Sequence, residues 1–294
     1  MNTKLCKRLN PLNDFLFFKV MGEKGDEVQL LGFLNAVLGR TGEYRLTSVE
    51  ILENKSFPAE VIGNKSSIFD VRAALHDGTR VNIEVQLRNL RNMDKRSLFY
   101  WSKEFTKNFK EGQNYRELPN VIAINIVNFE FLPSGGFHTV FHLREDSMNE
   151  LILTNALEIH ILDMVKYRRD VRKSSMNLNE MMQDPLQRWL AWFDLGSPPD
   201  LIAEVIRMDS AILRAEEKQE FVISDEDALQ IYEMRQKAIR DRISENDYAR
   251  EEGVKEGEER GKAEVARKMK KAGRPITEIE EFTGLPSATI EQIE

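Results

Sequence analysis

The chain has 294 residues, 41% of them hydrophobic, which suffices for one large domain, alone or with an appendage. Its formal net charge of −7 excludes a generally basic coat for nucleic acid, so any contact with DNA has to come from a local patch. One cysteine, Cys6, excludes an internal disulfide, and no apolar run resembles a membrane span or a signal peptide, so we expect a cytoplasmic protein.

The first expected element is a helix that ends near Met21. Pro11 precedes an aromatic and aliphatic run, and a proline at this place suits the start of a helix. Asp14 then has two readings: it stabilises the helix N-terminus, or it is an acid that projects toward a metal. Glu27, early in the next helix, competes with Asp14 for the second role.

An amphipathic helix and a strand are expected next. The helix covers residues 26–38 and is stopped by Gly39. Its apolar stripe consists of Leu30, Leu31, Leu34, Val37 and Leu38. Residues 44–52 predict a strand that leads through a polar loop to the centre of the sheet.

The most informative stretch covers residues 66–86. Apolar and polar residues alternate on both sides of Asp77 and Gly78, beginning at Phe69. Two runs of period two around an Asp-Gly pair predict a β-hairpin with one apolar and one polar face.

The length of the hairpin loop decides which residues face each other. A two-residue turn would set Asp70 opposite Val85 and mix a carboxylate with apolar side chains. A three-residue loop, His76 to Gly78 with Gly78 left-handed, sets Asp70 opposite Glu84 and keeps all apolar side chains on one face. We therefore predict the three-residue loop.

Asp70 and Glu84 form the candidate metal site. Directly opposed residues have β-carbons about 4.5–5.5 Å apart, and two carboxylates that close repel unless a cation or a proton lies between them. Such hard oxygen ligands suit Mg²⁺, with Mn²⁺ as a substitute. Two acids on a solvated hairpin face are the alternative, but the second strand is too apolar for a free edge.

Asp70 followed by Glu84-Val85-Gln86 on the next strand resembles the D…(D/E)-x-K core of the restriction-endonuclease-like superfamily. Further segments resemble the bacterial Rpn family of recombination-promoting nucleases and transposases: residues 13–22, residues 31–38, Arg96 with Tyr100, and residues 157–161. The resemblance implies an α/β fold with a restriction-endonuclease-like mixed central sheet flanked by helices, followed by a helical C-terminal extension.

The resemblance also implies an activity. It is that of a Mg²⁺-dependent DNA endonuclease in the bacterial cytoplasm, serving recombination or transposon-related cleavage. Asp70 and Glu84 would be the catalytic metal ligands, joined by the Val85 carbonyl. Gln86 stands where the superfamily usually has a lysine, so it can orient a water but supplies no charge. The alternative is a catalytically impaired protein of the same fold that binds nucleic acid or acts as an oligomeric regulator.

Residues 92–110 predict a helix with two stripes. Leu98, Trp101, Phe105 and Phe109 form an apolar one, and Arg96, Tyr100, Lys103, Lys107 and Lys110 form a second one. Residues 88–110 contain seven positive and two negative side chains. Such a run is often only a solvated face, but here it directly follows the candidate metal strand. We therefore expect Arg96, Tyr100, Lys103 and Lys107 to contact DNA phosphates, which gives low sequence specificity.

Three further strands are expected. Residues 120–129 are almost continuously apolar, which predicts a strand covered on both faces in the sheet interior. Residues 139–143 and 157–164 also have the composition of strands. His138 and His142 lie in a strand-like stretch, so the helical spacing of zinc ligands does not apply to them.

The rest of the chain is expected to be helical. We assign residues 10–240 to the nuclease-like domain and residues 241–294 to a second unit for oligomerisation or partner binding. Gly253, Gly257 and Gly261 recur every four residues, and each costs roughly 1 kcal/mol in a helix interior. Close contact between protomers, which favours a homodimer, and tolerance in an exposed helix both account for them.

Two short helical patterns close the chain, over residues 276–284 and 286–293. They resemble half of a helix-turn-helix. Because this unit is small and acidic, we expect dimerisation or partner binding from it rather than DNA recognition.

Overall fold

The computed structural model describes residues 8–52, 70–133, 135–173 and 182–293. The chain divides into two compact units, residues 1–235 and 236–294. The strands are β1 Val49–Ile51, β2 Val71–Leu75, β3 Arg80–Gln86, β4 Val121–Val127, β5 His138–Arg144 and β6 Ile152–Asp163. The α-helices are α1 Asp14–Met21, α2 Val28–Val37, α3 Met93–Thr106, α4 Met164–Lys173, α6 Pro185–Phe193, α7 Pro199–Met208, α8 Ser210–Ser224, α9 Glu226–Lys271, α10 Ile276–Thr283 and α11 Ser287–Gln292.

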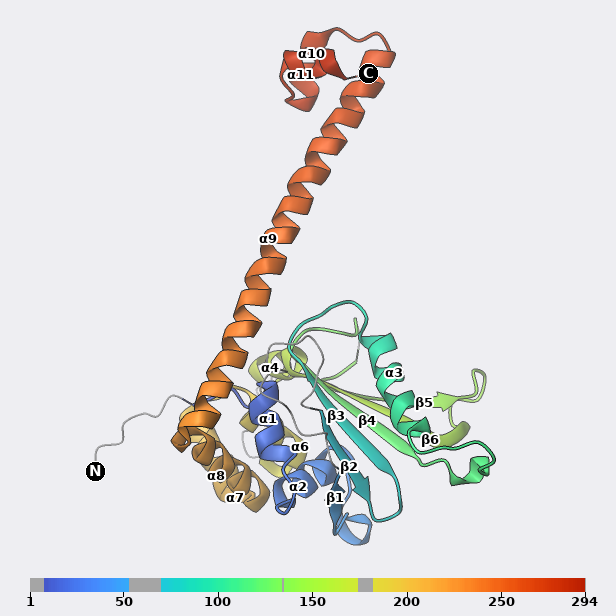
Figure 1. Cartoon of the computed structure of the whole chain (residues 1–294), viewed down its shortest axis with the longest axis vertical. Helices are drawn as coiled ribbons and strands as arrows, with labels where there is room; N and C mark the ends of the chain where they lie inside the picture. Colours follow the sequence, from blue (N-terminus) through green and yellow to red (C-terminus); the bar gives the residue numbers. More distant parts are fainter. Residues whose placement is uncertain (1–7, 53–69, 134, 174–181, 294) are drawn as a thin grey trace, which may run out of the picture. The chain divides into compact units, whose positions relative to one another are not determined.

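The six strands form one mixed sheet in the order β1-β2-β3-β4-β6-β5 (Figure 1). The hairpin strands β2 and β3 are antiparallel, β3, β4 and β6 are mutually parallel, and β5 returns antiparallel to β6. β4 lies in the interior and all seven of its residues are buried, as the apolar run predicts. The predicted α/β fold with a mixed central sheet is confirmed.

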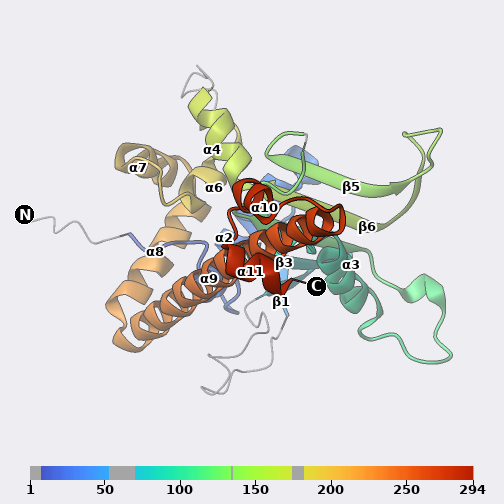
Figure 2. The same cartoon turned by 90° about the horizontal axis from the view of Figure 1, so that it is seen from above.

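Helices cover both faces of this sheet. α1, α2 and α6 lie on one face, with α8 packed against α1 and α2, and α3 lies on the other face (Figure 1, Figure 2). The larger core contains Leu16, Phe33, Ile83, Ile124, Trp189 and Phe193, all at most 1% exposed. The smaller core, under α3, contains Met93, Ala123, Val127, Ile159 and Ile161. Because α3 covers the polar face of the hairpin, it brings its own polar side chains against the candidate site.

Local sequence signals explain several element boundaries. Asn13 caps α1, because its side chain accepts a hydrogen bond from the Leu16 amide at 3.1 Å. Gly32 lets α2 approach α8 closely, since a β-carbon there would lie 2.3 Å from that of Ala211. The helix boundaries that position the site are therefore fixed by capping and close packing.

Two sequence predictions need correction. The strand expected over residues 44–52 is only Val49–Ile51, because a 3-10 turn, Gly42–Tyr44, precedes it. The helix expected over residues 92–110 ends at Thr106, so Lys107 and Lys110 follow the helix and do not extend its stripe. Leu98 is 49% exposed, because α3 turns Met93 and Ser97 toward the sheet instead.

The second unit has a small core of its own. Ala266, Ile279 and Ile290 are fully buried where the end of α9 packs with α10 and α11. Lys270 Nζ donates hydrogen bonds to backbone carbonyls at the end of α11, at 2.7 to 3.2 Å, where the negative end of the helix dipole favours a cation. Among the described residues, no helix is both long and apolar enough to cross a membrane.

Candidate active site

The hairpin places Asp70 and Glu84 opposite each other. Val71 pairs with Ile83 across β2 and β3, and the same register sets Asp70, directly before β2, against Glu84. The Gly78 amide donates to the Leu75 carbonyl at 3.0 Å, and Gly78 has a φ of +85°. The predicted three-residue loop with a left-handed glycine is confirmed, and with it the register. The part of the first predicted strand that includes Phe69 lies outside the described residues.

The two carboxyl groups influence each other strongly. Burial raises the pKa of Asp70 well above its usual range, and the charge of Glu84 raises it further. Glu84 is 1% exposed, and burial raises its pKa too, although the Arg96 guanidinium opposes that shift. Two facing acids with raised pKa values hold a proton between them or are stabilised by a cation.

Arg96 reaches this pair from α3. Its Nε lies 3.1 Å from Glu84 Oε2, and its guanidinium carbon lies 4.9 Å from the centre of the Tyr100 ring. α3 is anchored by Trp101, whose indole nitrogen donates to the carbonyls of Val121 and Ala156 at 3.2 and 3.1 Å. The sequence predicted Arg96 and Tyr100 on one stripe, and the structure turns that stripe toward the carboxylates.

The chemistry of the pair fits a divalent cation. Oε2 of Glu84 is taken by Arg96, whereas Oε1 is buried and accepts no hydrogen bond from any residue that the structure describes. A buried polar atom without a partner costs about 1–3 kcal/mol, which a bound cation would offset. The described residues contain no group of three or more His, Cys, Asp or Glu side chains suited to a metal. Two carboxylates remain sufficient for Mg²⁺, which keeps several waters.

The structure separates the two candidates for a third acid. Asp14, the first residue of α1, forms an ion pair with Arg235 (Oδ1 to Nε 3.2 Å), and its charge contributes to the raised pKa of Asp70. Glu27 follows the opposite end of α1 and accepts a hydrogen bond from the Gly25 amide at 2.8 Å. Asp14 is therefore the acid within electrostatic range of Asp70.

The remaining residues predicted for the site are Gln86, Lys103 and Lys107, and they differ in their contacts and exposure. Gln86 ends β3 on the same face as Glu84, two residues further along the strand. Lys103 is exposed on α3 with its Nζ 5.3 Å from the centre of the Phe99 ring. Lys107 follows α3, with its Nζ 4.0 Å from Glu104. Neither lysine has a contact with Asp70 or Glu84 among the interactions of the described residues, so the structure brings only Arg96 and Tyr100 of the predicted set to the pair.

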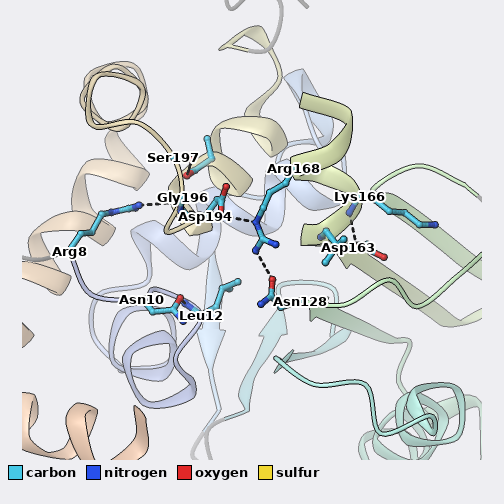
Figure 3. A network of polar contacts seen from close by, with 12 residues as sticks. Arg8, Asn10, Leu12, Asn128, Asp163, Lys166, Arg168, Asp194, Gly196 and Ser197 are labelled. Carbon is cyan, nitrogen blue, oxygen red and sulfur yellow. Dashed lines mark hydrogen bonds and ion pairs between the residues drawn. The ribbon is translucent and has the colours of Figure 1, made fainter. Parts of the chain in front are cut away.

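A polar network joins Asn128, Arg168 and Asp194 (Figure 3), and Asn128 in turn contacts the end of β3. The Asn128 amide donates to the Gln86 carbonyl at 2.9 Å, and the Asn128 side chain accepts from Arg168 Nη2 at 2.5 Å. Arg168 Nε donates to Asp194 Oδ1 at 2.9 Å. Asn128 directly follows β4, Arg168 lies in α4 and Asp194 directly follows α6, so no local sequence pattern could have associated them.

Asp163 holds α4 in that network. Its Oδ1 accepts the amide hydrogens of Val165 and Lys166 at 3.0 and 2.9 Å, and Oδ2 accepts that of Phe131 at 3.3 Å. Asp163 therefore caps the start of α4 and ties it to the loop after β4.

Comparison with known proteins identifies the family. Residues 11–249 match the family model described as PD-(D/E)XK nuclease family transposase. No curated protein and no solved structure matches the chain. The matched segment contains the whole sheet, α3 and the facing acids. The chain therefore belongs to the PD-(D/E)XK nuclease family transposases.

Proposed function

We propose that this protein is a Mg²⁺-dependent DNA endonuclease of low sequence specificity that acts in recombination or transposon-related cleavage. The observation that carries this proposal is the facing pair of Asp70 and Glu84, with a buried Glu84 oxygen that accepts no hydrogen bond from the described residues. Membership of a nuclease family supports the reaction class.

The candidate ligands are the two carboxylates and the backbone carbonyl of Val85. Carboxylate and carbonyl oxygens suit Mg²⁺, and Mn²⁺ could replace it. When bound, the ion would supply a Lewis acid that polarises the phosphodiester and lowers the pKa of a water. Because Glu84 is buried, the effective dielectric constant around it is lower than in water, and its attraction to a bound cation is stronger.

The neighbouring side chains have separate roles in the proposal. The Gln86 amide orients the attacking water by a hydrogen bond but provides no positive charge. Arg96 fixes the Glu84 carboxylate in one orientation and, with Lys103, offers a positive charge to the phosphate. Tyr100 lies against the Arg96 guanidinium and limits the positions open to it.

The contacts expected with DNA are to phosphates. Arg96, on α3, touches Glu84, and Lys103 and Lys107 follow it further along the same helix and just after its end. Phosphate contacts carry no base information. Binding should therefore weaken as salt rises and depend little on sequence.

The test is cleavage of supercoiled plasmid DNA with Mg²⁺. Asp70→Ala and Glu84→Gln should lower the rate at least about 100-fold, because either change removes half of the carboxylate pair. Glu50→Gln is the matched control: Glu50 is an exposed acid on β1, the strand next to β2, and does not line the site. Equal cutting by wild type and Asp70→Ala, purified identically, contradicts the assignment of the site.

A catalytically impaired nucleic-acid-binding protein is the second candidate. Gln86 favours it, because the position lacks the fixed charge of the superfamily lysine, and so does Arg96, which partly neutralises Glu84. Calorimetric titration with Mg²⁺ or Mn²⁺ separates the two proposals. DNA binding without any measurable response to either metal supports the impaired protein.

We also propose that residues 241–294 mediate homodimer formation in a cytoplasmic protein. A β-carbon at Gly253, Gly257 or Gly261 would meet no atom of the described residues within 4 Å, so this side of α9 has room for a partner. Removing residues 246–294 should reduce the mass in solution from dimer to monomer. An unchanged mass contradicts dimerisation through this segment.

A further inference from the structure

A cavity of about 680 Å³ lies at the turn end of the hairpin, between the hairpin and the chain that follows α3. Its volume falls within the range of about 300–1,000 Å³ that is common for ligand pockets. Cationic and aromatic side chains line it, among them Arg72, Arg80, Lys107, Arg116, Phe105 and Phe109, and the four cations outnumber the acids Asp77, Glu104 and Glu117 that line it too. None of these residues except Lys107 was predicted to contact DNA.

The positively charged side chains of this cavity lie close enough to influence one another. Burial lowers the pKa of Lys107, and the charges of Arg72 and Arg80 lower it further. Arg72 is neutralised by Glu104, whose Oε2 lies 2.7 Å from its Nη2. Arg80 and Arg116 form no ion pair within the described part of the chain, so their charges remain available to an anion.

The aromatic side chains give the cavity a rigid apolar wall. Phe105 stacks on Trp101, with ring centres 4.8 Å apart, and Phe109 stacks on Tyr115 at 5.4 Å. Both phenylalanines are half-buried and line the cavity. Because each ring is already held by a neighbour, a flat apolar group could bind there with little loss of side-chain entropy.

The cavity and the acids share one face of the sheet. Arg72 lies two residues after Asp70 on the hairpin, and Arg80 lies four residues before Glu84. Four residues of strand span about 13 Å, which is the length of a few nucleotides at 3.4 Å of rise each. A DNA strand with one phosphate at the acids would therefore extend to this cavity.

We propose that the cavity binds one nucleotide of a DNA strand, a few positions from the phosphate at Asp70 and Glu84. Arg80, Arg116 and Lys107 contact the phosphate of that nucleotide, and its base lies against Phe105 and Phe109. This inference rests on the proposed function, because it takes DNA as the substrate. It assigns a second anchoring point that holds the strand in register.

The test measures binding without cleavage. A labelled single-stranded oligodeoxynucleotide of about 12 nucleotides is titrated with protein in EDTA, with fluorescence anisotropy as the readout. The variant is Arg80→Ala/Arg116→Ala, accompanied by the single Arg116→Ala, which changes only an exposed side chain and leaves packing intact. The control is Lys95→Ala, an exposed cation of α3 that does not line the cavity.

The expected result is a loss of affinity of about tenfold for each arginine and less than about threefold for the control. The salt dependence should also become shallower, by about 0.7 in slope for each lost contact. The nucleotide dAMP should compete with the oligonucleotide, whereas deoxyadenosine, which lacks the phosphate, should not.

Several results would overturn the proposal. Equal losses in the arginine variants and in Lys95→Ala would show a general charge effect. Competition by deoxyadenosine as strong as that by dAMP would exclude phosphate recognition. A third result is that dAMP competes but the arginine variants bind the oligonucleotide as tightly as the wild type. This would show that the cavity binds a free nucleotide and not a DNA strand. Because no cleavage is needed, a protein that never cuts DNA can still bind as proposed.

Discussion

Arg96 Nε lies 3.1 Å from Oε2 of Glu84, and this contact joins α3 to the centre of the sheet. Glu84 is almost fully buried, whereas Arg96 keeps a fifth of its side chain exposed. In the protein without metal or DNA, this ion pair therefore stabilises the buried charge of Glu84.

Substitution of Arg96 should show how much the ion pair contributes to stability. Arg96→Gln is expected to destabilise the protein at pH 7 by about 2–3 kcal/mol, somewhat below the range for fully buried pairs, because it leaves the Glu84 charge without its partner. Urea denaturation measures the change. Arg96→Gln/Glu84→Gln should recover most of the loss, and Lys95→Gln, the neighbouring exposed cation, should cost little. A double variant as unstable as the single one would show that Arg96 acts through packing instead.

The raised pKa of Asp70 predicts how stability depends on pH and metal. In the metal-free protein, the stabilisation from a protonated Asp70 is complete below its unfolded pKa, near 4, and is lost as pH rises through its raised folded pKa. The metal-free melting temperature should therefore fall over this range, and Asp70→Asn should remove that fall. Mg²⁺ should stabilise the wild type more at pH 8 than at pH 5, because it binds the ionised pair. A Mg²⁺ effect that does not vary with pH contradicts the carboxylate pair as its site.

The glutamine after the acidic strand position can be replaced by the residue that the superfamily usually has. Gln86→Lys adds a positive charge next to Glu84, where it should stabilise charge that develops on the phosphate. We expect the single-turnover cleavage rate to rise about tenfold or more, with DNA affinity changed less. The matched control is Gln113→Lys, which adds the same charge at an exposed site on the cavity rim. Equal increases for both variants would show attraction of DNA rather than help with the reaction.

A histidine pair on β5 and β6 should make the fold sensitive to acid. His138 Nε2 lies 2.9 Å from His160 Nδ1, and burial, followed by the charge of His160, lowers the pKa of His138 to about 4, against the influence of Asp184 and Glu158. Between about pH 6.5 and 4 the unfolded chain binds a proton that folded His138 does not, so stability should fall as pH falls through this window. Thermal denaturation of wild type and His138→Gln measures this, and the variant should lose part of the acid sensitivity. Identical pH profiles of wild type and His138→Gln would show that His138 is not the source of the acid sensitivity.

The sequence by itself determined the hairpin and the identity of its facing acids. The alternation of side chains is strictly of period two, so only one loop length keeps Val81 and Ile83 on the apolar face, and that length sets Asp70 against Glu84. The same local logic gave the buried strand β4, because six of its seven residues are apolar, which is typical of a strand covered on both faces.

Only the tertiary structure decided what surrounds those acids. The rotation of α3 on the sheet turned Arg96 toward Glu84 and left Leu98 exposed, although the sequence assigned Leu98 to the apolar stripe of that helix. The support of Gln86 by Asn128 and Arg168 joins residues 40 positions apart in the chain. Periodicity fixes which residues share a face, but the partner of each face depends on how distant elements dock, and no local pattern encodes that.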